Sequence, residues 1–142
     1  MKIEKNLKSI GILLFLLAGS FSFAGYKSEL SERIKQFENE AVNTGNTTVE
    51  MTDAAEKYYK NVDNELNTVY KKLISELERK NKSKAKENLV KAQKNWIKQR
   101  DEKAKAVPRE GTVTTINVYY LMAELTQKRA LELAEMLDNL SK

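Results

Sequence analysis

The residue types that most often do chemistry in proteins are scarce in this sequence of 142 residues. It contains no histidine and no cysteine, which excludes an imidazole base, a thiolate nucleophile and a histidine or cysteine metal site. Carboxylates remain, and Asp101 and Glu102 are adjacent. Neighbouring residues on a helix point about 100° apart and do not face one substrate. Because no phosphate loop or calcium loop pattern appears either, we expect no enzyme activity, no metal and no cofactor.

Polar residues interrupt the apolar stripe of each of the three long predicted helices. In the segment KAQKNWIKQRD (91–101), Gln93, Trp96 and Arg100 fall on one helix face. A buried charge is tolerated only with a partner. We therefore expect a single network across the helices, in which Arg100 or Arg129 pairs with Asp63 and aromatic residues exclude water. Its predicted members are Asp63, Asn67, Tyr70, Gln93, Trp96, Arg100, Asp101, Thr126 and Arg129.

This predicted network has two interpretations. It can fix the register of the helices, as single buried polar residues do in coiled coils. It can also form a polar pocket that binds a ligand. Buried polar groups more often specify packing than chemistry, which favours the first interpretation. A variant in which Asp63 is replaced by alanine separates the two, because only the first predicts a lower melting temperature.

Helical periodicity organises the segments that position these residues. Four helices are predicted, over about 29–43, 47–79, 84–106 and 113–139. The predicted N-caps are Ser28, the Thr47–Glu50 capping box and Ser83. The chain breaks at Gly45, at the turn 80–84 within a basic cluster and around Pro108 and Gly111. We predict an all-α fold, an antiparallel three-helix bundle (47–142) with a short additional N-terminal helix and linker (25–46).

The first 24 residues have the pattern of a signal peptide. A charged start, MKIEKNLK, precedes the apolar run IGILLFLLAGSFSF, and Ala24 ends a suitable cleavage motif. We therefore expect an exported protein, periplasmic or extracellular, with no stable membrane span after cleavage. Residues 1–24 contain three lysines and one glutamate, so the rest has 22 basic and 19 acidic residues, a net charge of +3. This mild charge, together with export, argues against nucleic-acid binding.

Three ordered motifs resemble the lysozyme inhibitor LprI-like family over about residues 47–137. They are DNELNTVY (63–70), AQKNWIKQRD (92–101) and LTQKRALEL (125–133). They match the family pattern at Leu66 and at all nine predicted network residues. The resemblance implies an exported helical domain of the bacterial envelope, and lysozyme inhibition for some relatives. Family members commonly have cysteines where this sequence has Ala54, Ala104 and Leu121, so their disulfide is absent here.

Two functions remain open from the sequence. The first is a binding protein that blocks a lysozyme by presenting the loop around Pro108, Arg109, Glu110 and Gly111 to the enzyme cleft. A net charge of +3 opposes this, because lysozymes are generally basic. The second is a structural or adhesive helical protein of the envelope with no inhibitory activity. The long apolar stripe over 55–77 and the separate helix at 29–43 favour that alternative, through self-association or docking on an envelope partner. Such a stripe is more often the ordinary core of a helical bundle.

Overall fold

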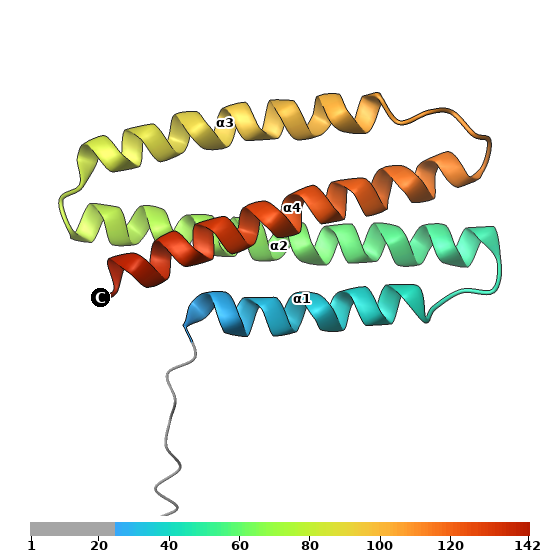
Figure 1. The fold of residues 1–142 in the computed structure, drawn as a ribbon, viewed down its shortest axis with the longest axis horizontal. Helices are drawn as coiled ribbons and strands as arrows, with labels where there is room; N and C mark the ends of the chain where they lie inside the picture. The colour runs from blue at the N-terminus through green and yellow to red at the C-terminus, as the bar shows by residue number, and fades with distance from the viewer. Residues whose placement is uncertain (1–24) are drawn as a thin grey trace, which may run out of the picture.

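The computed structural model describes residues 25–142, which form four helices and no strand (Figure 1). The helices are α1 (Tyr26–Val42), α2 (Thr48–Arg79), α3 (Ser83–Lys105) and α4 (Val113–Leu140). Each helix runs antiparallel to the next, so the α1–α2 turn and the α3–α4 loop lie at the same end. None of these four helices is both long and apolar enough to cross a membrane. The predicted signal peptide lies outside the described residues.

Helices α2 and α4 form the centre of the structure. Their contact buries Val62, Val69 and Leu73 of α2, and Leu133 of α4, without exposed surface. The facing side of α4 also has small residues, among them the fully buried Ala130, which lets the two helices approach closely. Helix α1 packs on both of these helices, and α3 packs on both as well, while α1 and α3 do not contact each other. The core is therefore covered by α1 on one side and by α3 on the other.

The all-α prediction is confirmed, but the grouping of three helices plus one additional helix is not. Helix α1 inserts Leu30 and Ile34 into the common core, at 0% and 1% exposure. Helix α3 buries only Leu89 and Gln93. The N-terminal helix is thus anchored by its apolar residues more deeply than α3 is. The predicted domain boundary at residue 46 stays a prediction.

The capping residues were partly predicted. The Thr47–Glu50 capping box is confirmed, with both reciprocal hydrogen bonds present. Ser28 and Ser83 as N-caps are wrong, because α1 and α3 have no side-chain cap from their own N-terminal residues. Instead, the Asp138 carboxylate of α4 accepts hydrogen bonds from two backbone N–H groups of α1, at Tyr26 (2.7 Å) and Lys27 (3.0 Å). This cap comes from 112 residues away, so no local pattern could reveal it.

We expect Asp138→Ala to destabilise the protein by about 2 kcal/mol, since two backbone donors lose a charged acceptor. The free energy of unfolding in urea measures this effect. Asn139→Ala is the matched control, because Asn139 is exposed and bonds only to the terminal Lys142 side chain. Equal stabilities of the two variants would show that the Asp138 cap does not hold α1.

Candidate functional site

Arg100 is the centre of a polar cluster between α2 and α3. Its Nη1 lies 3.2 Å from Asp63 Oδ1, and its Nη2 lies 2.9 Å from Asp101 Oδ1. Asn67 Nδ2, one turn after Asp63 on α2, donates to Asp63 Oδ2 at 3.1 Å. The Arg100 side chain is only 12% exposed. One largely buried guanidinium is therefore neutralised by two carboxylates, because a buried charge without a partner would be strongly destabilising.

Two aromatic rings lie against the same guanidinium. Arg100 Cζ is 5.1 Å from the ring centroid of Trp96 and 5.9 Å from that of Tyr59, within the range of cation–π contacts. Tyr59 also stacks on Tyr119 of α4, with 6.2 Å between centroids. Burial raises the pKa of Tyr59, so this phenol stays neutral at physiological pH. The sequence reasoning missed Tyr59 as a site residue, although it lies one helical turn before Asp63.

Arg129 belongs to a second polar group. Its Nε donates to Gln93 Oε1 at 3.0 Å, and its Nη1 is 3.0 Å from Glu132 Oε2. Within residues 25–142, no hydrogen bond joins this group to the Arg100 cluster. Gln93 and Arg100 are seven residues apart, which separates them by about 10 Å along a helix. The expected single network is thus two groups, and Arg100, not Arg129, pairs with Asp63.

We expected aromatic residues to exclude water from the network, but carboxylates of both groups are partly exposed, including Glu132 at 49%. The side chain of Asp63 is 32% exposed and that of Asp101 is 44% exposed. Tyr70 is half-buried and packs against the apolar core, without a bond to either group among the described contacts. The charges of each group satisfy one another, and no side chain is poised as a nucleophile. This arrangement suits fixing α3 onto α2 and α4 better than it suits catalysis.

Thr126, the remaining motif residue, is fully buried, and its Oγ1 has no hydrogen-bond partner within residues 25–142. A buried hydroxyl without a partner loses its hydration and gains nothing in exchange. We expect Thr126→Val, which keeps the shape, to raise the free energy of unfolding by about 1 kcal/mol. Calorimetric melting measures the change, with Thr68→Val as control, because the Thr68 hydroxyl donates to Asn64 O. A destabilised Thr126→Val protein would indicate a hydrogen-bonding role for this hydroxyl.

The predicted partner-binding loop joins α3 to α4. Pro108, Arg109 and Glu110 are exposed there. Gly111 has φ +70°, a left-handed conformation that favours glycine, and nothing lies within 4 Å of a Cβ built on it. The Glu110 N–H donates to Thr114 Oγ1 at 2.6 Å, which ties the loop to the first turn of α4. The loop is thus exposed, charged at its tip and fixed at its base.

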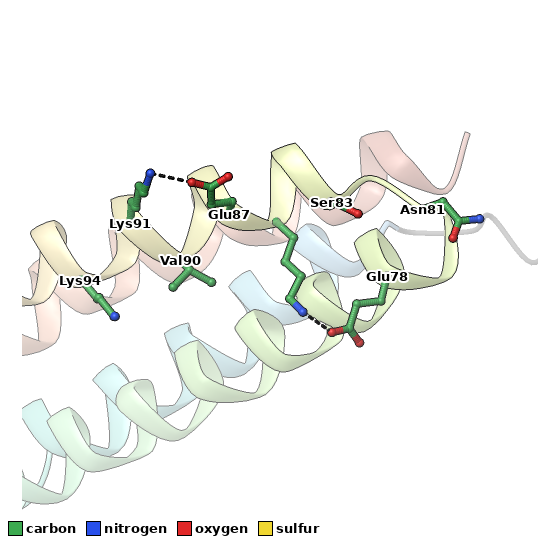
Figure 2. Close-up of a pocket in the computed structure, with 8 residues that line it drawn as sticks. Glu78, Asn81, Ser83, Glu87, Val90, Lys91 and Lys94 are labelled. Carbon is green, nitrogen blue, oxygen red and sulfur yellow. Dashed lines mark hydrogen bonds and ion pairs between the residues drawn. The ribbon is translucent and has the colours of Figure 1, made fainter.

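A separate surface hollow of about 580 Å³ lies between the end of α2 and the start of α3 (Figure 2). Four of its five charged side chains pair with each other, Lys86 with Glu78 (2.5 Å) and Lys91 with Glu87 (2.7 Å), and Lys94 is the fifth. None of the predicted site residues lines it. The hollow is therefore separate from the predicted network, and most of its charge is neutralised by its own ion pairs.

Residues 39–133 match the family model described as lysozyme inhibitor LprI. The match covers most of the chain and includes Leu66, all nine predicted network residues and the α3–α4 loop. The resemblance carried by the three motifs is therefore confirmed. A search of curated proteins and a search of solved structures found no match.

Proposed function

Because the chain belongs to the lysozyme inhibitor LprI family, we propose that it is an exported protein of the bacterial envelope that binds a lysozyme and blocks its cleft. The family match over residues 39–133 is the observation that supports this function. Export is supported by the charged and apolar pattern of residues 1–24. Protein binding without catalysis also fits a chain that has neither histidine nor cysteine.

The α3–α4 loop is the element that we propose to enter the enzyme cleft. Pro108 restricts the backbone, and the bond between Glu110 N–H and Thr114 fixes the loop before a partner arrives. A preorganised loop loses little conformational entropy on binding. Exposed Glu110 has the charge that a cationic cleft attracts. In this proposal the Arg100 cluster and the Arg129 group are scaffold, holding α3 so that its loop is presented at one end.

The alternative of a self-associating helical protein loses the observation that favoured it. The apolar stripe over 55–77 lies inside the bundle, where Val62, Leu66, Val69 and Leu73 are at most 2% exposed. These residues already pack against α4 and α1, so they do not form an exposed apolar surface for a second chain. A second function therefore has no specific support from this stripe.

Calorimetric titration of residues 25–142 into a cationic animal lysozyme tests the proposal. We expect one-to-one binding with a Kd of about 1 µM or tighter. Replacing residues 108–111 by Gly-Ser-Gly-Ser, which keeps the length, should weaken binding by at least about tenfold. Lys82→Ser, at the opposite end of the bundle, is the control and should bind normally. An absence of binding by the unaltered protein at about 100 µM would overturn the proposal.

A further inference from the structure

Three exposed apolar side chains flank the α1–α2 turn. Val42 ends α1, and Val49 and Met51 lie in the first turn of α2, with exposures of 60%, 70% and 46%. We call these three residues the turn patch. They lie at the end of the bundle where the α3–α4 loop also lies (Figure 1). Single exposed apolar residues are ordinary, but three on one short turn form a concentrated surface that a partner can cover.

The turn patch lies in the acidic part of a basic protein. Residues 36–56 contain five acidic residues and no basic one, whereas residues 79–105 contain eleven basic and three acidic residues. Helices α1 and α3 do not contact each other and lie on opposite sides of α2 and α4 (Figure 1). The two charge signs are therefore largely but not fully separated in space, because Lys57 lies 3.7 Å from Glu40 and Lys60 lies 2.6 Å from Glu56. The net charge of +3 is therefore the sum of an acidic segment, 36–56, and a more strongly basic segment, 79–105, with the rest of the chain.

The turn that holds the patch is fixed by its own hydrogen bonds. The Glu50 carboxylate accepts from the backbone N–H groups of Asn46 (2.8 Å) and Thr47 (3.1 Å). These backbone bonds, that of Asn46 first, lower the pKa of Glu50 and keep it charged. Gly45 has φ +106°, and a Cβ there would lie 2.8 Å from Met51 N, so only glycine fits this close approach. The surface is thus formed before any partner binds, which lowers the entropic cost of association.

We propose that the turn patch and the carboxylates of residues 36–56 around it are the docking surface for a cationic protein partner. This inference rests on the proposed function, in which the partner is a basic lysozyme. An apolar centre with a charged border is the usual anatomy of a protein interface. At physiological salt the screening length is about 8 Å, so an approaching partner experiences the carboxylates of Glu38 and Asp53, which have no ion-pair partner among residues 25–142, more than the lysines at the start of α3, which lie at the opposite end of the bundle. This surface lies at the end that presents the α3–α4 loop, so one partner can contact both.

Two variants test the surface in calorimetric titrations against a cationic lysozyme at about 150 mM salt. Val49→Ser with Met51→Ser removes apolar surface, and Glu38→Lys with Asp53→Lys reverses two exposed charges. We expect each pair to raise the Kd by at least about tenfold.

Ile97→Ser and Glu102→Lys make similar changes on the exposed face of α3 and should alter the Kd less than about twofold. The affinity of the charge variant should also depend less on salt than that of the unaltered protein.

The outcomes separate the surface from the function. If the unaltered protein binds and both turn variants bind equally well, the docking surface is wrong while the proposed function stands. If the unaltered protein does not bind at all, both the docking surface and the proposed function are wrong. Light scattering of the protein alone measures whether it forms a dimer. A dimer that the Val49→Ser, Met51→Ser variant dissociates would assign the patch to a second copy and overturn the inference. All substituted positions are exposed, and melting curves should match that of the unaltered protein.

Discussion

Ile34→Ala is expected to lower the free energy of unfolding by about 3 kcal/mol. Ile34 is 1% exposed and lies in the core that α1 shares with α2 and α4. Removing most of this side chain loses apolar burial and leaves a cavity between three helices. The result would show that α1 is part of the bundle and not an appendage. Urea unfolding at equilibrium provides the measurement.

Ile97→Ala is the control for this prediction. Ile97 lies on α3 and is 40% exposed, so the same chemical change should cost less than about 1 kcal/mol. Similar losses in the two variants would contradict the packing of α1 described above. A biphasic unfolding curve for the unaltered protein would also contradict it, because one shared core predicts a single cooperative transition.

Arg100→Ala is expected to cost about 2 kcal/mol in stability. It leaves Asp63 and Asp101 without their shared cation and removes the contact with the Trp96 ring. A fully buried pair would cost more, but the partial exposure of both carboxylates lets water compensate some of the loss. Arg100→Lys should recover only part of the stability, because lysine lacks the planar fork that reaches two carboxylates.

A double-mutant cycle between Arg100→Ala and Asp63→Asn isolates the ion pair itself. We expect a coupling energy of about 1 kcal/mol from unfolding measurements. Arg79→Ala is the control, because Arg79 pairs with Glu76 on the exposed surface of α2, where such pairs contribute little. Additive losses in the cycle, or full stability after Arg100→Ala, would show that the cluster does not fix α3 in place.

Local patterns predicted the helices well, and the reason is physical. The spacing of apolar residues and the T-x-x-E capping box depend on neighbours within one or two turns. The chemistry of the Arg100 cluster was also predictable in kind, since a guanidinium on an inward face requires a carboxylate. Whether Arg100 or Arg129 would pair with Asp63 depended on how the helices align along one another. The sequence contains no local signal for that alignment.

The docking of α1 could not be predicted for the same reason. Its narrow apolar stripe indicated an amphipathic helix but not the surface that it covers. The structure shows two long-range links, the Asp138 cap and a two-bond ion pair from Arg33 to Glu65 (2.8 and 3.0 Å). The partners are 112 and 32 residues apart in the chain. Such pairs become visible only when the helices are assembled.

The family motifs and the proposed binding surfaces occupy different parts of the molecule. Most of the motif residues lie in the Arg100 cluster, in the Arg129 group or in the core, where they contact one another or apolar neighbours. The α3–α4 loop and the turn patch lie at one end and are exposed. This division predicts that substitutions in the motifs lower stability, whereas substitutions at that end change affinity.

The most direct test is the rate at which a lysozyme clears a suspension of bacterial cell walls, measured by turbidity against the molar ratio of residues 25–142 to enzyme. We expect the rate to fall steadily and to reach its minimum near a one-to-one ratio. Heat-unfolded protein at the same concentration should leave the rate unchanged. Undiminished lysis in the presence of excess folded protein would show that this protein does not inhibit the lysozyme.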